Sequence, residues 1–249
     1  MKLADYADRY EKIRFERTDG VLEVTLHTRG GEALWGASPS SLHCELGDAF
    51  LDVARDVENK IILLTGTGRS FIGAMDPEER HPESTYADMW DRIYPEGVAL
   101  LENLLAIPVP VIAAVNGPAL VHAELAVLSD IVLAADHAEF ADLAHGPTGV
   151  VPGDGVQTVW QMLLGPNRGR YFLLTGQRLS AQEALRLGVV GEVLPLAQLM
   201  PRARELAHGL AVHPRRMLKH SRTALVRHLR KRLRDEIDLG LALEALATL

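Results

Sequence analysis

A small group of ionisable side chains lies directly after apolar, strand-like segments of this chain. His122 follows the Asn116-Gly117 turn, His145 follows the apolar stretch 138–141, and Asp154 begins an apolar helix. Proteins of the α/β class place their reactive groups in loops that follow parallel strands. An imidazole exchanges its proton near neutral pH, and a carboxylate can orient the ring and stabilise its charged form. These side chains therefore predict acid–base chemistry, with His145 and Asp154 as the candidate pair.

Each of these residues also has a structural interpretation that the sequence leaves open. Asp154 is suited to cap the helix that it begins, and a lone histidine is often a partly buried core residue. A metal site is a third interpretation, but the chain contains no His-x-x-His or His-Glu-x-x-His spacing. We therefore expect no metal ion. The single cysteine, Cys44, lies in an amphipathic segment and is interpreted as a core residue.

Motifs for nucleotide binding and for nucleophilic catalysis are missing from the sequence. The glycine-rich segment 66–71 has phenylalanine where a dinucleotide-binding loop needs its third glycine. There is no Gly-Lys-Ser/Thr phosphate loop and no Gly-x-Ser-x-Gly elbow. One cysteine can form neither an internal disulfide nor a cysteine-based zinc site. We expect the chain to use no cofactor.

The overall charge and hydropathy restrict the kinds of partner and the compartment. The 33 acidic and 26 basic residues give a formal charge of −7, which disfavours nucleic acids and anionic membranes as partners. The longest apolar run, residues 104–115, contains two prolines and is too short to span a bilayer. Charged residues at the N-terminus interrupt the apolar core that a secretory signal needs. We expect a cytoplasmic protein that acts on a small molecule.

Strand and helix patterns alternate over the first three quarters of the chain. Residues 13–17 and 21–27 predict a hairpin across Asp19-Gly20, and Ser38-Pro39 predicts a helix start. Apolar runs predict further buried strands, and Ser180-Ala181-Gln182-Glu183 is a capping box. The predicted strands after the hairpin are residues 61–65, 109–115, 131–135 and 189–194. The pattern predicts an α/β core over residues 1–194 and a helical region over residues 195–249.

Five ordered motifs resemble the crotonase (enoyl-CoA hydratase/isomerase) superfamily over nearly the whole chain. They are Ser70-Phe71-Ile72-Gly73-Ala74-Met75-Asp76, Pro110-Val111-Ile112-Ala113-Ala114-Val115-Asn116-Gly117, Ser129-Asp130-Ile131-Val132-Leu133-Ala134, Gly149-Val150-Val151-Pro152-Gly153, and Leu174-Thr175-Gly176 with the capping box. The resemblance implies a crotonase-like spiral of ββα units with a helical C-terminal region. It also implies a homotrimer or a dimer of trimers, and an oxyanion hole of two backbone N–H groups.

Several residues depart from the family pattern, and these departures indicate which branch of the superfamily the chain resembles. Leu120-Val121-His122-Ala123 replaces the usual run of glycines, so the second oxyanion-hole donor falls at Val121 and its geometry is in question. Glu124 keeps the position of the first catalytic glutamate, whereas His145 takes the position of the second. The early loop 29–35 lacks the family's Asn-Ala-Leu signature for coenzyme A.

With these departures the sequence resembles one branch of the superfamily, the alicyclic β-diketone hydrolases that include 6-oxocamphor hydrolase. This branch uses no coenzyme A. Segments 151–155, 165–176 and 239–247 are similar to that branch. The resemblance implies an active site lined by residues matching His122, His145, Asp154 and Glu244, with Trp35 against the substrate. For Glu244 and Trp35, ordinary packing remains an open alternative.

The sequence therefore predicts a hydrolase that cleaves a carbon–carbon bond of alicyclic β-diketones by a retro-Claisen reaction. In this hypothesis His145 is the general base that activates water, and Asp154 orients the His145 ring. His122 donates to the carbonyl oxygen, together with the backbone near Gly73 and Ala74. The alternatives are a coenzyme A-dependent enoyl hydratase or isomerase of the same superfamily, and a non-catalytic oligomeric paralogue that binds RNA or serves as a scaffold.

Overall fold

Short apolar runs form the central sheet of the computed structural model, which describes residues 1–247. Its six strands lie in the order β1-β2-β3-β4-β5-β8, and a second sheet pairs β6 with β7. The strands are β1 (Ile13–Thr18), β2 (Val21–Leu26), β3 (Ile61–Gly66), β4 (Val111–Val115), β5 (Ile131–Ala135), β6 (Glu139–Phe140), β7 (Leu179–Ser180) and β8 (Glu192–Leu194). The parallel strands β3, β4 and β5 are almost entirely buried, as expected for a sheet covered on both faces.

The predicted hairpin is confirmed. Strands β1 and β2 pair antiparallel, and the two turn residues between them, Asp19 and Gly20, have φ values of 51° and 83°. Two consecutive positive φ angles give the turn a twist that matches the twist of the strands. The remaining pairs of the six-stranded sheet are parallel. Their C-terminal ends therefore meet at one edge of the sheet, where the loops carry the candidate residues.

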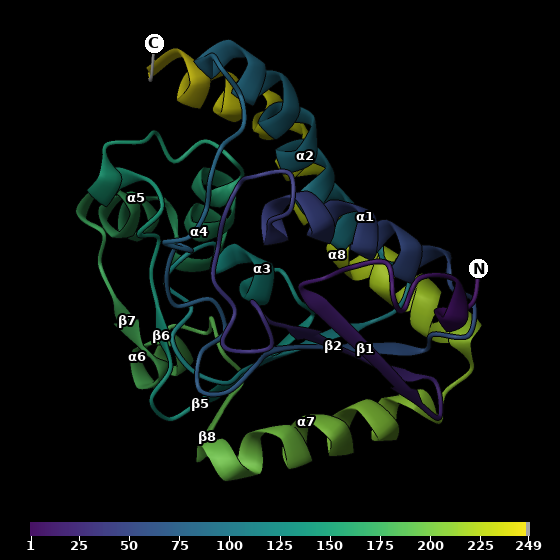
Figure 1. The fold of residues 1–249 in the computed structure, drawn as a ribbon. Helices are drawn as coiled ribbons and strands as arrows, with labels where there is room; N and C mark the ends of the chain where they lie inside the picture. Colours follow the sequence, from purple (N-terminus) through teal and green to yellow (C-terminus); the bar gives the residue numbers. More distant parts are fainter. Residues whose placement is uncertain (248–249) are drawn as a thin grey trace.

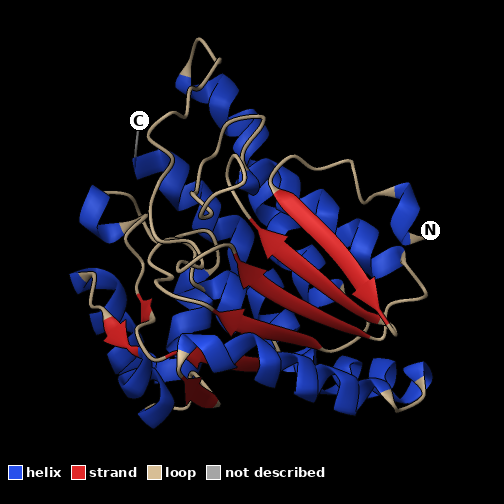
Figure 2. Cartoon of the chain, turned by 60° about the horizontal axis from the view of Figure 1, so that its bottom comes forward, coloured by secondary structure: helices blue, strands red, loops and turns tan. Residues whose placement is uncertain are grey.

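The helices cover both faces of the sheet (Figures 1 and 2). They are α1 (Leu42–Arg55), α2 (Tyr86–Ala106), α3 (Glu124–Val127), α4 (Val156–Leu164), α5 (Pro166–Thr175), α6 (Ala181–Arg186), α7 (Leu196–Ala211) and α8 (Arg215–Ala247), with single 3₁₀ turns at Leu3–Asp5 and Gly146–Thr148. Helix α7 packs on one face through small and apolar residues such as Leu199 and Ala203. Helices α1, α2 and α8 lie on the opposite side, over the larger core (Figure 1).

The predicted mixed α/β fold with a helical C-terminal region is confirmed, but several predicted boundaries were wrong. Strand β4 begins at Val111 and not at residue 109. Helix α1 begins at Leu42 because Ser41, and not Ser38, caps it by accepting a hydrogen bond from the Cys44 N–H. Ser38 instead closes a backbone turn with Ser41. Strand β8 comprises only residues 192–194, because residues 189–191 lead into it as a connection in which Val189 and Val190 are buried. The capping box at Ser180 is confirmed.

Backbone hydrogen bonds join the three loops at the C-terminal edge of the sheet. The Ile72 carbonyl accepts from the Leu120 and Val121 N–H groups, and the Ala119 carbonyl accepts from the Ala141 N–H. The Asn116 side chain ties the ends of β3 and β4 through Gly66 and Gly68. These contacts hold the loops that follow β3, β4 and β6 in one layer. None of the helices in residues 1–247 has the length and apolarity needed to cross a membrane.

Candidate functional site

His145 lies in the loop after β6, buried at 2% exposure between two aspartates. Its Nδ1 is 2.7 Å from Asp142 Oδ1, and its Nε2 is 3.4 Å from Asp154 Oδ2. His145 and Asp154 therefore lie close together, as predicted. The prediction that Asp154 orients the His145 ring is corrected, because Asp142 makes the shorter contact. Asp142, three residues earlier on the same loop, contacts Nδ1 of His145, and Asp154 faces the other ring nitrogen, Nε2.

His122 lies in the loop between β4 and α3 with a strained backbone, since its φ is 51°. Its Nδ1 is 2.7 Å from Glu124 Oε1 and 3.1 Å from Asp154 Oδ2. The ring stacks on the indole of Trp35 with centroids 3.9 Å apart and an interplanar angle of 28°. Where the family pattern has glycines, this chain holds a histidine in a conformation that favours glycine. We expected the replacement to alter the backbone at Val121, but the positive φ falls one residue later.

Asp154 lies between the two imidazoles and is placed there by the glycines on either side. Gly155, with a φ of 111°, occupies the N-cap position of α4 and makes no side-chain cap, so Asp154 is not the N-cap residue. A Cβ atom at Gly153 would come within 2.2 Å of the Gly240 carbonyl oxygen on α8. Both positions require glycine, and together they aim the Asp154 carboxylate at the histidines. Its Oδ1 is buried without a hydrogen-bond partner in the described part of the chain.

Glu244 reaches the site from α8, one helical turn beyond Gly240. The close contact between Gly153 and Gly240 brings this end of α8 against the loop that carries Asp154. Glu244 Oε1 is 4.0 Å from His145 Nε2, and its side chain is 13% exposed. The alternative that Glu244 is simply a solvated residue of an amphipathic helix is therefore wrong. The C-terminal helix folds over the site of its own chain.

The charges of this cluster shift its pKa values in opposite directions. Burial alone would lower the pKa of both imidazoles, but facing carboxylates outweigh it and raise the pKa of His122 and, by more, of His145. Burial works against ionised Asp154, yet the two imidazoles hold its pKa below the ordinary value. Burial and the nearby Asp154 charge raise the pKa of Glu244 to about 8. These shifts favour charged imidazoles and an ionised Asp154, and the pKa of about 8 keeps Glu244 protonated at neutral pH.

The remaining predicted site residues have different environments. The Val121 N–H donates to the Ile72 carbonyl at 3.2 Å, so the proposed oxyanion-hole donor already has an acceptor. Gly73 and Ala74 lie in the segment beside Trp35, and the backbone N–H of Trp35 donates to the Ala74 carbonyl. Trp35 is only 2% exposed, with one face covered by His122. Contact of Trp35, Gly73 and Ala74 with a substrate stays a prediction.

Sequence reasoning missed two features of the site. Asp142 was overlooked, although the spacing Asp142-x-x-His145 is a usable signal for a carboxylate that holds an imidazole. His43 was overlooked because it lies within amphipathic helix α1. Its ring packs edge-on against Trp35 at 5.8 Å, and its Nδ1 is 3.0 Å from Glu96 Oε2 on α2. A third, partly buried imidazole–carboxylate pair thus supports the other side of Trp35.

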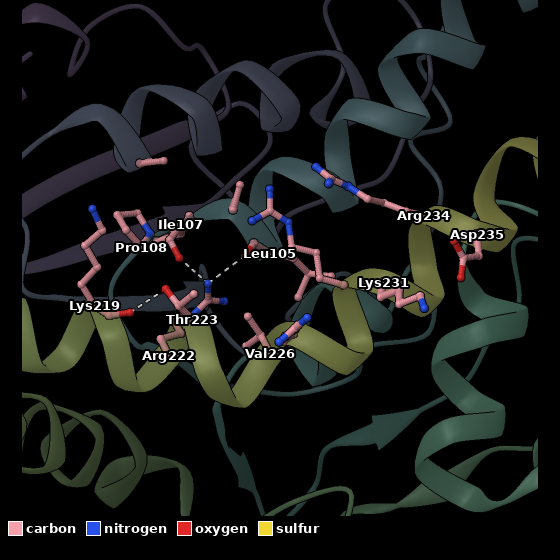
Figure 3. A pocket seen from close by; sticks show the side chains of 14 residues that line it. Leu105, Ile107, Pro108, Lys219, Arg222, Thr223, Val226, Lys231, Arg234 and Asp235 are labelled. Atoms are coloured by element: carbon pink, nitrogen blue, oxygen red, sulfur yellow. Dashed lines mark hydrogen bonds between the residues drawn. The ribbon is translucent and has the colours of Figure 1, made fainter.

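A large open cavity of this molecule lies elsewhere. It has a volume of about 810 Å³ and runs along α8 beside the connection from α2 to β4 (Figure 3). Basic side chains line it, among them Lys219, Arg222 and Lys231. It contains no histidine and none of the four carboxyl groups around His122 and His145. Burial raises the pKa of the Cys44 thiol to about 11, so the thiolate needed for nucleophilic chemistry is scarce at neutral pH.

Comparisons with known proteins agree on the family. Residues 16–245 match the enoyl-CoA hydratase/isomerase family model. Carnitinyl-CoA dehydratase of Shigella flexneri is 33% identical over 206 residues, which cover 80% of this chain and 74% of that protein. An enoyl-CoA hydratase/isomerase structure from Mycobacterium paratuberculosis has 25% identity and a TM-score of 0.80, with 95% of this chain and 93% of that chain covered.

One solved structure is considerably more similar. It is a β-diketone hydrolase from the cyanobacterium Anabaena sp. PCC 7120 bound to (S)-3-oxocyclohexyl acetic acid. It shares 42% identity with this chain and has a TM-score of 0.91, over 98% of this chain and 96% of that chain. The family match, the identities and the shared fold together establish that this chain belongs to the enoyl-CoA hydratase/isomerase family, the crotonase superfamily.

Proposed function

We propose that this protein hydrolyses alicyclic β-diketones by a retro-Claisen reaction that gives a keto acid and uses no coenzyme A. The observation that carries the proposal is the buried pair of imidazoles, His122 and His145, facing one shared carboxylate, Asp154. The similar Anabaena protein, which is a β-diketone hydrolase bound to a cyclic keto acid, supports this substrate class.

The reaction makes three chemical demands. Water adds to one ketone carbon as a base removes its proton. The bond between that carbon and the carbon separating the two carbonyls then breaks, and its electron pair passes to the second ketone as an enolate. A proton delivered to the enolate carbon completes the keto acid. A site for this reaction therefore needs a base, a donor for the developing oxyanion, and an acid.

His145 and Asp154 supply the base in this proposal. Asp142 fixes the ring through Nδ1, so Nε2 faces Asp154 and the space where water is activated. Because the two aspartates raise the pKa of His145, the ring of the resting enzyme carries a proton at neutral pH. Only the neutral ring can accept a proton from water. Turnover is therefore expected to increase as pH rises through the neutral range.

His122 stabilises the oxyanion. Both of its carboxylate contacts use Nδ1, which leaves Nε2 to donate to a substrate oxygen. The facing carboxylates raise the pKa of His122 and so favour the charged ring, and a charged donor suits an oxygen that gains negative charge. This donor replaces the Val121 N–H, which is already bonded to Ile72. Loss of one such donor typically costs about 3–4 kcal/mol of transition-state energy.

Glu244 supplies the final proton. A carboxyl group with a pKa of about 8 is protonated at neutral pH, so it can donate where an ordinary glutamate cannot. Its position at the end of α8, 4.0 Å from His145 Nε2, puts the acid beside the base. After the proton leaves, the proton taken from water by His145 can restore Glu244.

A direct test compares the loss of ultraviolet absorbance of cyclic and bicyclic 1,3-diketones with the hydration of crotonyl-CoA. Diketone cleavage should dominate, with one oxygen from ¹⁸O-labelled water in the new carboxylate. His145→Ala should lower kcat by about 10²–10⁴-fold. His137→Ala is the matched control, since the half-buried His137 pairs with Asp136 and with none of the carboxylates of the cluster in the described part of the chain. Hydration of crotonyl-CoA with no cleavage of any diketone would overturn the proposal.

The second candidate, a coenzyme A-dependent hydratase, rests on the similarity to carnitinyl-CoA dehydratases. Glu124 supports it in part, because this residue retains the position of the first catalytic glutamate of the family. Yet Glu124 is 1% exposed and bonded to His122, which leaves it poorly placed to meet a substrate. The diketone assay above separates the two candidates in one experiment.

A further inference from the structure

Three potential metal ligands converge in the centre of the site, each from a different loop. His122 Nδ1 is 3.1 Å from Asp154 Oδ2, and His145 Nε2 is 3.4 Å from the same oxygen. These three residues each offer one ligand atom, and the three atoms lie within 4.8 Å of one another. From this geometry we propose that the site binds one divalent transition-metal ion, of which Zn²⁺ is the best match, and that the bound ion inhibits the enzyme.

The ligand spacing and chemistry suit a small tetrahedral ion. Zinc bonds to imidazole nitrogen and carboxylate oxygen are about 2.0–2.2 Å long, which separates neighbouring ligands of a tetrahedron by about 3.3–3.6 Å. The two contacts of Asp154 Oδ2 with the imidazoles are near that separation already. Two imidazoles with one carboxylate also leave the fourth position open. No metal-binding motif is visible in the sequence because the three ligands come from three separate loops.

One carboxylate supports the ligand His145 from outside the set, and a second lies beside the ligand His122. Metal-bound histidines usually donate their second ring N–H to a carboxylate, which fixes the tautomer and strengthens the ligand. His145 has this arrangement, because Asp142 contacts Nδ1 at 2.7 Å and leaves Nε2 facing the centre. Glu124 lies against His122 Nδ1 at 2.7 Å and is close enough to shift onto an ion as a further oxygen ligand.

The charge of the cluster also favours a cation. Four carboxyl groups, those of Glu124, Asp142, Asp154 and Glu244, surround two imidazoles in a volume that is almost closed to water. Binding through His122 Nδ1 and His145 Nε2 needs both atoms unprotonated, so a divalent ion takes the place of one proton on each ring and leaves the net charge of the cluster unchanged. The carboxylates that faced the two protonated rings then face the ion, and burial strengthens that attraction.

The consequence for activity follows from the shared atoms. An ion held by His145 Nε2 removes the base, and an ion held by His122 Nδ1 removes the proton that keeps this ring charged. The expected inhibition therefore rests on the proposed function, whereas binding of the ion does not. A binding measurement made without any substrate can separate the two.

The decisive experiment titrates the metal-free enzyme with Co²⁺, a spectroscopic probe for zinc sites. One Co²⁺ per chain should bind with visible absorption bands, and Zn²⁺ should displace it. His122→Asn and Asp154→Asn should each abolish the bands, and Asp142→Asn should weaken binding by about 10–100-fold as a supporting carboxylate. His137→Asn, which alters an imidazole–carboxylate pair with Nδ1 and oxygen 3.3 Å apart, should bind as the unaltered protein does.

Two results would overturn the proposal. One is the absence of saturable binding at millimolar Co²⁺ and Zn²⁺. The other is equal binding by the His122→Asn, Asp154→Asn and His137→Asn proteins, which would locate the ion elsewhere. Circular dichroism and melting curves identify a variant that has lost its fold, and then the milder Asp142→Asn titration decides. An enzyme that binds Co²⁺ in this way but cleaves no diketone would contradict the proposed function alone.

Discussion

Two buried polar clusters, one around Arg222 and one around His145, differ in how completely their groups are paired. Arg222 is 2% exposed and donates to Asp130 Oδ2 through Nε. Its Nη1 donates to the carbonyls of Leu105 and Ile107 (Figure 3). The same Asp130 oxygen also accepts the Val111 N–H at the start of β4. This cluster locks α8 to the connection between α2 and β4.

The cluster around His145 is buried to a similar degree but is neither fully paired nor relaxed. Asp142, Asp154 and Glu124 each keep one buried carboxylate oxygen without a hydrogen-bond partner among the described residues. His122 has a positive φ, which costs on the order of 1 kcal/mol or more for a residue with a side chain. Unpaired buried groups and local strain are expected where a ligand completes the network. The difference indicates that the cluster around Arg222 supports the fold, and it agrees with the proposal that the cluster around His145 binds a ligand.

The strongest test of this comparison is Asp142→Asn. The amide cannot accept the Nδ1 proton of His145 in the same way, so it changes which ring nitrogen carries the proton. Loss of the equivalent tautomer control in serine proteases lowers kcat by about 10⁴-fold, and we expect about 10³–10⁴-fold here. Because Asp142 already has an unpaired buried oxygen, the melting temperature should change little. A large loss of stability with unchanged kcat would show that this cluster is structural.

Arg222→Leu tests the other side of the comparison. Removal of one partner from a buried ion pair typically costs about 3–5 kcal/mol, because the remaining charge stays buried. Asp130 would lose its partner while its side chain is 14% exposed. We expect this loss in chemical denaturation, with kcat unchanged for the molecules that remain folded.

The matched control for Arg222→Leu is Arg227→Leu on the same helix. Arg227 lines the same cavity but is exposed, so its replacement should change the free energy of unfolding by about 0.5 kcal/mol or less. Equal effects of the two substitutions would contradict the structural role of Arg222.

The contrast between these clusters also explains what the sequence could and could not predict. Buried strands are visible as apolar runs, and the hairpin at Asp19-Gly20 and the capping box at Ser180 are local patterns, so all were predicted. The resemblance placed His122, His145, Asp154 and Glu244 in one site, and the structure brings them together. A short-range pattern or a family motif was available in each case.

Pairing within the site could not be predicted, because it depends on how loops approach each other. Asp142 and Asp154 are equally plausible partners for His145 in sequence, and only the loop geometry assigns one to each nitrogen. His43 was hidden because its position fits the amphipathic pattern of α1. The end of α8 was hard to place because its approach depends on the contact between Gly153 and Gly240, which are 87 positions apart.

Glu244→Gln tests the cluster around His145 through the pH dependence of stability. A carboxyl group whose pKa rises from 4.5 to about 8 on folding binds its proton more tightly in the folded state. Its contribution to stability is therefore full below about pH 4.5 and is lost as pH increases toward 8, by at most about 1.4 kcal/mol per pH unit. Glutamine does not ionise, so the variant avoids the cost of a buried charged carboxylate at high pH. Its melting temperature should match the unaltered protein near pH 5 and exceed it at pH 8–9, whereas identical profiles would exclude a buried neutral Glu244.

The smallest expected effect belongs to the stacked pair of Trp35 and His122. A charged imidazole over an indole face is stabilised by about 0.5–2 kcal/mol, so the stack contributes to the raised pKa of His122. Trp35→Leu should therefore lower that pKa by about 0.4–1.5 units, since one unit corresponds to 1.36 kcal/mol. NMR titration of the His122 ring measures this shift directly, and the His137 ring is the internal control. An unchanged His122 titration, with kcat reduced and KM increased, would instead assign Trp35 to the substrate as a wall of the pocket.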